Sequence, residues 1–223
     1  MSLFAISDLH LSLGTDKPMD VFGEKWENYE EKLKENWIKN VNSGDTVIIG
    51  GDTSWATYLK DLYPDFNFIN SLPGKKILVK GNHDYWWTTK SKMDSYCSDN
   101  GFNTIDFLNN NHYMYEDIAI CGTRGWAITT NTDDRKIYNR ELERLTLSLD
   151  SCKKSNPKSI LAILHYPPDV RFRELLVKYR VETCVFGHLH GKAQKNVINC
   201  TIDGIKYYFI SCEFLQFSPL KVF

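Results

Sequence analysis

Hydrophobic residues along this chain gather in short runs that are apolar at nearly every position. Five runs of strand length, rich in β-branched residues, cover residues 3–6, 47–49, 77–79, 160–164 and 183–186. A strand with one face in water alternates apolar and polar side chains, whereas a strand covered on both faces stays apolar. The pattern therefore predicts five buried strands.

Between these runs the apolar side chains recur at helical spacing, three and four residues apart. Four helices are predicted on this basis: one carrying Trp26, Tyr29, Leu33 and Trp37, one from about Thr88 to before Gly101, one carrying Leu142, Leu145 and Leu149, and a short one carrying Leu175, Leu176 and Tyr179. The polar segment 129–135 is interpreted as a surface loop. Together with the helix after it, this loop is a candidate lid over a pocket.

Two hairpins complete the prediction. Residues 197–202 and 206–210 flank Asp203-Gly204, a strong turn signal, and residues 113–115 and 118–121 flank the weaker Glu116-Asp117. Helices that alternate with buried strands indicate a layered α/β protein with a mixed sheet. At 223 residues we expect a single domain, residues 1–223.

Composition narrows the range of partners. Lys plus Arg is 27 and Asp plus Glu is 28, a net charge of -1, so we expect no general binding to nucleic acid. No apolar run is long enough to span a membrane, and the first residues lack a basic leader, so we expect a cytoplasmic protein without membrane contact. The 6 cysteines form no CxxC pair and are expected to be reduced and mostly buried.

Polar side chains follow each of the five buried runs. They are Asp8 and His10, then Asp52, then Asn82, His83 and Asp84, then His165, then His188 and His190. Open α/β sheets bind their ligands at the carboxyl ends of strands, and alternate residues of an extended segment point the same way. Imidazole and carboxylate groups without thiolate suit transition metals such as zinc, iron, manganese, cobalt or nickel. Asp84 fits two roles equally, orienting His83 or capping the next turn.

Taken in order, the motifs Asp-x-His, Gly-Asp, Gly-Asn-His-Asp, a strand-end His and Gly-His-x-His resemble those of the calcineurin-like metallophosphoesterases. The resemblance runs from Asp8 to His190. It implies a four-layer α/β/β/α sandwich with two mixed sheets flanked by helices.

The resemblance also implies a site for two divalent or mixed-valence transition metal ions, of which manganese, iron and zinc are the expected ones. One ion would bind Asp8, His10 and His190, the other Asn82, His165 and His188, and Asp52 would bridge both. A hydroxide bridging the ions would attack the phosphorus of a monoester or diester. By the same resemblance His83 is no ligand and donates a proton to the leaving oxygen.

Some positions depart from particular branches of that superfamily. Thr53 and Ser54 follow Asp52 where protein Ser/Thr phosphatases continue with Arg-Gly, and Asp84 follows His83 where they have Glu, which argues against that branch. We expect a small phosphorylated substrate. The alternatives are a nucleotide or cyclic-nucleotide phosphodiesterase and, outside enzymes, a metal-retaining scaffold for protein binding.

Three further side chains keep two interpretations each. Arg124 fits a phosphate contact or an ion pair with an acid. Trp86 and Trp87 fit a wall of the site or the hydrophobic core.

Overall fold

Two β-sheets face each other at the centre of the molecule, as seen in a computed structural model that describes residues 1–223 apart from the side chain of Asn196. The first sheet has the strand order β11-β1-β2-β3-β4. Its strands are β1 (Leu3–Ile6), β2 (Thr46–Ile49), β3 (Lys75–Leu78), β4 (Ile105–Phe107) and β11 (Leu220–Lys221). β1 to β4 are parallel, and β11 pairs antiparallel with β1.

The second sheet has the order β5-β6-β7-β8-β10-β9. Its strands are β5 (His112–Tyr115), β6 (Ile118–Thr123), β7 (Ser159–Leu164), β8 (Thr183–Phe186), β9 (Thr201–Ile202) and β10 (Ile205–Phe209). β6, β7, β8 and β10 are parallel, and the two edge strands pair antiparallel through the Glu116-Asp117 and Asp203-Gly204 turns. Both sheets are therefore mixed, as the resemblance implied.

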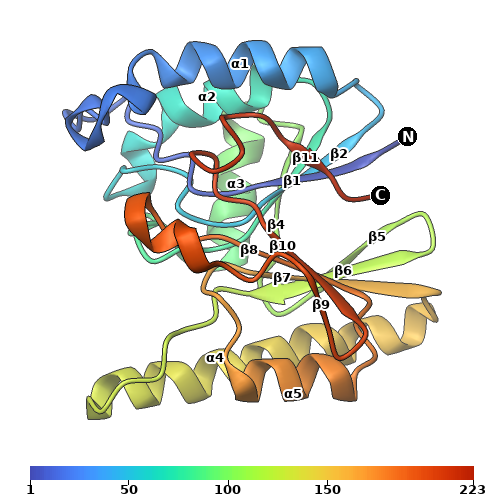
Figure 1. Ribbon diagram of the computed structural model, residues 1–223. Helices are drawn as coiled ribbons and strands as arrows, with labels where there is room; N and C mark the ends of the chain where they lie inside the picture. The colour runs from blue at the N-terminus through green and yellow to red at the C-terminus, as the bar shows by residue number, and fades with distance from the viewer.

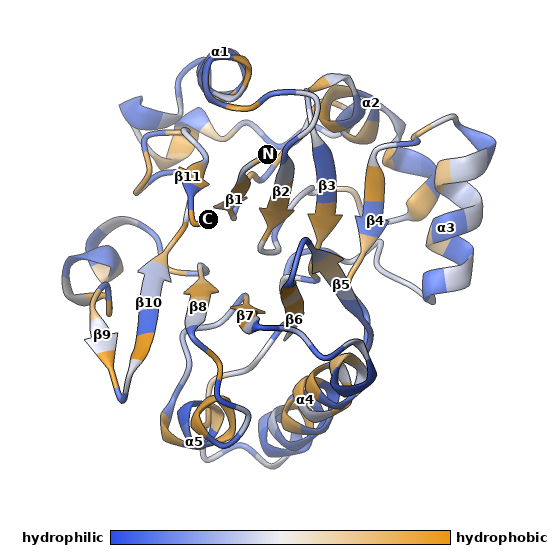
Figure 2. Ribbon diagram, turned by 90° about the vertical axis from the view of Figure 1, so that its right-hand side faces the viewer, coloured by the Kyte–Doolittle hydropathy of each residue, from blue (hydrophilic) through white to orange (hydrophobic). Residues whose placement is uncertain are grey.

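Helices cover the outer face of each sheet and make four layers (Figures 1 and 2). α1 (Tyr29–Asn40), α2 (Tyr63–Ser71) and α3 (Lys90–Asp99) lie over the first sheet, and α4 (Thr132–Ser151) and α5 (Val170–Lys178) lie over the second. Short 3-10 helices occur at η1 (Asp20–Phe22), η2 (Glu24–Trp26), η3 (Leu59–Asp61), η4 (Cys152–Ser155) and η5 (Gly191–Asn196). Of the helices described, none combines the length and apolarity that crossing a bilayer demands.

The apolar runs are buried on both faces, which explains their lack of alternation. In β1, Leu3 and Ala5 join the core between the two sheets, while Phe4 and Ile6 join the core beneath α1 to α3. A third core, between the second sheet and α4 and α5, includes Leu145 and Phe172. Three stacked cores hold the strand ends of both sheets in a fixed relation.

Several predicted boundaries were wrong. Residues 132–135, interpreted as loop, form the first turn of α4, whose Asn131 side chain accepts a hydrogen bond from Asp133 N at 2.8 Å. The helical face expected from Trp26 begins at Tyr29, because Trp26 belongs to η2. Residues 197–200 are not in a strand, and β3 begins and ends earlier than residues 77–79. α2, β4 and β11 were not predicted. The six cysteines are free and five of them are buried.

Candidate metal centre

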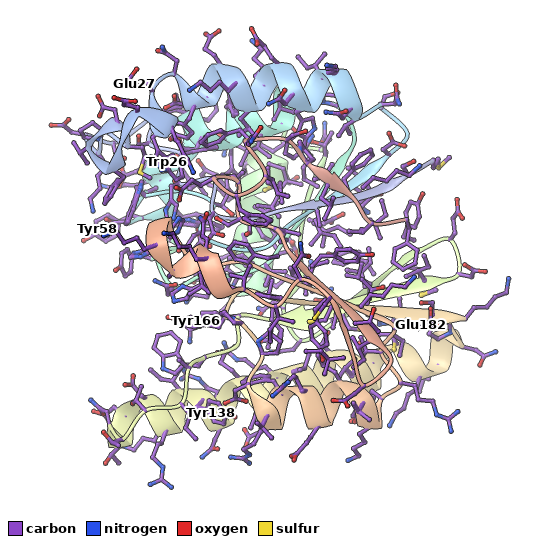
Figure 3. The ribbon with its side chains drawn as sticks, in the orientation of Figure 1. Trp26, Glu27, Tyr58, Tyr138, Tyr166 and Glu182 are labelled. Carbon is purple, nitrogen blue, oxygen red and sulfur yellow. The ribbon has the colours of Figure 1, made fainter. Side chains whose placement is uncertain are left out.

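The predicted site residues meet at one end of the sandwich, where parallel strands of both sheets end. Asp8 and His10 follow β1, Asp52 follows β2, and Asn82 and His83 come soon after β3. From the second sheet, His165 follows β7, and His188 and His190 follow β8. Trp26 reaches this end from the α1 side, and Tyr166 reaches it from the side of the second sheet (Figure 3).

The first ligand group consists of Asp8, His10 and His190, whose donor atoms lie within 4.8 Å of one another. His10 Nε2 and His190 Nε2 are 3.2 Å apart, and His190 Nε2 is 3.8 Å from Asp8 Oδ1. Asp8 and His10 are buried, whereas His190 is partly open to solvent. One face of this group is therefore accessible.

The second ligand group consists of Asp52, His165 and His188, again within 4.8 Å. His165 Nε2 lies 3.4 Å from Asp52 Oδ2, 3.3 Å from His188 Nδ1 and 2.8 Å from Asn82 Oδ1. Asn82 thus joins this group, as the resemblance implied. The ring of Tyr166 covers the ring of His188 at a centroid distance of 3.8 Å.

Asp52 connects the two groups. Its Oδ2 atom lies 3.8 Å from His10 Nε2 and 3.4 Å from His165 Nε2, so one carboxylate oxygen faces an imidazole of each group. Its other oxygen accepts a hydrogen bond from His83 N at 2.8 Å. A carboxylate in this position can serve two cations at once.

The atoms around His165 favour positive charge. His165 Nδ1 lies 3.0 Å from the carbonyl oxygen of Gly50, which can only accept, so Nδ1 carries a hydrogen. Its other nitrogen, Nε2, faces oxygen atoms of Asn82 and Asp52, which are acceptors. Either a proton on Nε2 or a metal ion in its place satisfies these atoms, and with a metal bound Nε2 supplies its lone pair to the ion.

The nitrogen spacings agree with this interpretation. Two imidazole nitrogens bound tetrahedrally to one zinc ion lie about 3.3–3.4 Å apart, since each bond is about 2.0–2.1 Å. The observed pairs, His10 with His190 and His165 with His188, are separated by 3.2 Å and 3.3 Å. Each group therefore has the spacing of a metal site.

The histidines of the two ligand groups differ in pKa. Burial lowers the pKa of His10 and of His188 to about 3, which leaves both rings neutral and able to coordinate. Burial also acts to lower the pKa of His165, but the Asp52 and Asp8 carboxylates outweigh it and raise that pKa to about 9. His165 lies among the carboxylates, where positive charge is most strongly favoured.

The backbone at the ligands differs from the extended segments we expected. Asp8, His10, Asp52 and His188 have φ values of 59°, 47°, 50° and 74°, all in the left-handed region. The predicted mechanism, alternate residues of an extended chain pointing one way, was therefore wrong. Tight left-handed turns aim these side chains, and His188 and His190 face different ligand groups.

Two glycines allow the loops to approach this closely. A Cβ atom at Gly81 would lie 2.1 Å from Asp52 N, and a Cβ atom at Gly187 would lie 2.4 Å from Asp8 Oδ2. Neither position has room for a side chain. Both glycines belong to the motifs that the sequence presented.

Asp84 ties the motif loops together. Its carboxylate accepts hydrogen bonds from Gly81 N at 2.7 Å, Asp52 N at 3.0 Å and Thr53 N at 2.9 Å. Ser54 N and Trp86 Nε1 donate to it as well, at 3.3 and 3.1 Å. Burial, helped by the nearby Asp52 charge, raises the pKa of Asp84 to about 6. Asp84 therefore fixes the main chain of the loops after β2 and β3. The sequence-based alternatives, orienting His83 or capping the next turn, did not include this role.

His83 lies beside the first ligand group without belonging to it. Its ring centroid is 5.7 Å from that of His10 and 4.6 Å from that of Trp55. Burial lowers the pKa of His83, while the Asp52 charge acts in the opposite direction. The bond from His83 N to Asp52 fixes its backbone next to the ligands.

Glu213, from the loop after β10, was missed because no motif marks it. Its Oε2 atom lies 3.7 Å from His190 Nδ1 and accepts hydrogen bonds from Gly191 N and Gln194 Nε2. A carboxylate behind a coordinating imidazole orients the ring and increases its basicity. Ser7 orients Asp8, since its hydroxyl donates to Asp8 Oδ2 at 2.6 Å.

The structure decides between the interpretations of Arg124 and Trp86. Arg124 Nη2 donates to Glu141 Oε1 at 3.2 Å, so the arginine pairs with an acid. Trp86 is 2% exposed and packs edge-on against Phe66, which places it in the core. Trp87 is partly buried against the same core.

Comparison with known proteins agrees with this architecture. The sequence matches the model of the calcineurin-like phosphoesterase family over residues 1–192, and the chain belongs to this family. No curated protein matches the sequence. The expected fold is therefore confirmed, and the family and the ligand groups together support a metal-dependent phosphoesterase in general terms.

Solved structures show the same fold at low identity. A phosphopantetheinyl hydrolase from Mycobacterium tuberculosis has a TM-score of 0.62 and 13% identity, over 99% of this chain and 95% of that one. A protein of unknown function, AQ665 from Aquifex aeolicus, has a TM-score of 0.54 and 19% identity over the same shares. At these identities the likeness concerns the fold alone.

Proposed function

We propose that the protein hydrolyses phosphate monoesters or diesters of small molecules with two metal ions, most simply manganese, iron or zinc. The first ion would be held by Asp8, His10 and His190, the second by Asn82, His165 and His188, and Asp52 would be shared. Ions at these ligands supply positive charge to phosphoryl oxygens and lower the pKa of a water molecule.

The observation that carries this proposal is the position of Asp52. One oxygen of a buried carboxylate faces imidazole nitrogens of two separate ligand groups, at 3.8 and 3.4 Å. A single-metal site needs no such shared group. A carboxylate placed this way supports two cations acting together on one phosphoryl group.

The remaining residues of the site have roles that follow from their contacts. Asp84 keeps Asp52 in place through main-chain hydrogen bonds. Glu213 and Ser7 orient His190 and Asp8. His83, held beside Asp52 and outside both ligand groups, gives a proton from its ring to the leaving oxygen.

Metal content and hydrolysis test the proposal together. Protein reconstituted with manganese, iron or zinc should contain two ions per chain and hydrolyse members of a panel of monoesters, diesters, nucleotides and cyclic nucleotides. Asp52→Asn should lower the occupancy of both sites, because the amide has no negative charge to share. One ion or none per chain in the wild type would contradict the two-metal proposal.

The rival interpretation, a metal-retaining scaffold, gives a different result in the same experiment. A scaffold would bind two ions and hydrolyse nothing on the panel. A scaffold would not need a histidine beside Asp52 that binds neither metal ion. The position of His83 is therefore why we favour the enzyme. Preference for nucleotides over other esters would select the nucleotide phosphodiesterase alternative.

A further inference from the structure

A cavity of about 300 Å³ opens beside the first ligand group. We call it the aromatic pocket. It is lined by Met19, Phe22 and Trp26 from the η1–η2 segment, by Trp55, and by His10, His83, His190, Gly191 and Glu213. Its volume is at the lower end of the range for small-molecule sites, about 300–1,000 Å³.

The walls of the aromatic pocket are held in place from behind. Trp26 is 3% exposed and packs edge-on against Tyr29 and Phe217, with ring centroids 5.2 and 5.3 Å away. Trp55 stacks on His10 at 4.9 Å with 25° between the planes. These rings are positioned before any ligand arrives, which reduces the entropy lost on binding.

Apart from the three histidine rings at the ligand end, the one polar side chain that lines the aromatic pocket, among the residues that the structure describes, is Glu213, and it is already engaged. The Oε2 atom of Glu213 accepts from Gly191 and Gln194, and its Oε1 atom is 3.6 Å from Lys25 Nζ. A sugar or polyol would bring several hydroxyl groups to a surface with little left to bond them. An apolar ring loses nothing there and gains contact with Met19, Phe22 and Trp26.

The position of His83 indicates which half of an ester enters. His83 lines the aromatic pocket, together with His10 and His190 of the first ligand group. Under the proposed function, His83 gives its proton to the leaving oxygen, so the group attached to that oxygen lies on the His83 side. Lys17 Nζ lies 4.1 Å from the centre of the Trp55 ring, which stacks on His10.

We propose that the aromatic pocket binds the leaving group of the substrate, and that this group carries a flat apolar ring. The proposal rests on the proposed function, since it needs a phosphate ester at the adjacent ligand groups. It assigns the η1–η2 segment as the element that selects the substrate.

Two esters with the same kind of leaving oxygen test it: 2-(1-naphthyl)ethyl phosphate and ethyl phosphate. Both release a primary alkoxide, so a difference between them reports the ring. For the manganese-loaded protein, kcat/KM should favour the naphthyl ester by about 10- to 100-fold, the factor that burial of an aromatic ring provides. The matching phosphonates, which cannot be hydrolysed, should differ in Kd in the same direction by calorimetry.

Phe22→Ala and Val21→Ala form a matched pair of variants. Phe22 and Val21 are 67% and 70% exposed on the same 3-10 helix, and only Phe22 lines the pocket. Phe22→Ala should reduce the naphthyl-to-ethyl ratio about threefold or more, whereas Val21→Ala should keep the wild-type ratio. Metals are counted in each protein.

The outcomes of these experiments distinguish failure of the ring-binding pocket from failure of the phosphoesterase proposal. Hydrolysis of both esters with equal kcat/KM, or equal Kd for the two phosphonates, would overturn the ring-binding pocket and leave the phosphoesterase proposal standing. Hydrolysis of other members of the panel but of neither ester would also overturn the ring-binding pocket alone. Hydrolysis of no member of the panel with manganese, iron or zinc would overturn the phosphoesterase proposal, and this one with it. An equal change of the ratio in both variants, or none in Phe22→Ala, would overturn the assignment of the η1–η2 segment as the element that selects the substrate.

Discussion

Asp84 accepts hydrogen bonds from main-chain N–H groups of two different motif loops, and it does so inside the protein. An asparagine has the same shape but presents an N–H group where a second acceptor is needed. Asp84→Asn should therefore lower the free energy of unfolding by about 1–3 kcal/mol, the cost of buried donors left unpaired. Urea unfolding of metal-free protein measures this.

Asp106→Asn is the matched control. Asp106 pairs with Lys75 at the surface, at 2.7 Å, and exposed pairs usually contribute less than about 1 kcal/mol. Equal destabilisation by the two substitutions would show that the bonds of Asp84 are not what organises the loops.

The role of His83 is tested through the leaving group. A nitrophenolate departs without a proton, whereas an alkoxide needs one, and a positioned acid contributes about 10²- to 10⁴-fold. His83→Ala should therefore keep both metals and slow alkyl esters far more than nitrophenyl esters. Turnover of both substrate types, with metals counted, is the measurement.

Two results would revise the assignment. Loss of metal from His83→Ala would make His83 a ligand. Equal slowing of both substrate types with the metals retained would mean that His83 positions the phosphate and transfers no proton.

At the scale of elements, Lys76 joins β3 to the end of α2. Its Nζ donates to Leu72 O at 2.7 Å and to Gly74 O at 2.8 Å, and its side chain is fully buried. Desolvation lowers the pKa of Lys76 to about 8. Between that value and its ordinary value the unfolded chain binds more protons than the folded one, so the contribution of Lys76 to stability rises with pH.

Comparison with Lys76→Met isolates this effect. The difference in unfolding free energy, wild type minus variant, should be constant below about pH 7 and should increase by about 1–2 kcal/mol between pH 8 and pH 10. Urea unfolding at each pH measures it, with the exposed neighbour substituted as Lys75→Met for control. A difference that falls as pH rises would mean that folding favours the charged form of Lys76.

Polar residues inside or beside the elements explain why some bounds were misplaced and some elements were not predicted. β3 contains Lys75 and Lys76, so the search for apolar runs began only at residue 77. The first turn of α4 contributes no residue to the core and is polar, so it shows no helical spacing of apolar side chains. α2 buries Asp65 along with Phe66 and Ile69, which blurs its apolar face. β11 is two residues long and depends on pairing with β1.

The site was more predictable than the boundaries, because strand ends are marked by motifs that the sequence displays. All seven proposed ligands and His83 lie together. Glu213 was unpredictable, since it comes to His190 only through tertiary folding of the segment after β10. The left-handed turns were also hidden, because non-glycine residues adopt a positive φ in only a few per cent of cases, so an Asp or His in the sequence does not by itself predict one.

For the whole molecule, each ligand group draws on both sheets. In the first ligand group, Asp8 and His10 come from the first sheet and His190 from the second. In the second ligand group, Asp52 comes from the first sheet and His165 and His188 come from the second. Bound ions would therefore tie the two halves of the sandwich together. At a metal concentration 100 times Kd, each ion should add about 2.7 kcal/mol to the unfolding free energy.

Thermal unfolding with manganese and with chelator tests this. Addition of metal should raise Tm of the wild type and of His112→Ala, whose histidine lies on β5 away from the site. His188→Ala should lose much of the increase. Identical unfolding of metal-loaded and chelated wild type would mean that the ions do not join the sheets.

The left-handed backbone at Asp8, His10, Asp52 and His188 has a bearing on how such a chain evolves. Each of these residues is in a conformation that costs a side chain about 1 kcal/mol or more, and that glycine adopts freely. A lineage that no longer needed the metals could relieve this backbone strain by mutating a ligand to glycine. The benefit would be largest at His10 and His188, since the carboxylates of Asp8 and Asp52 also accept buried main-chain hydrogen bonds that glycine would leave unpaired.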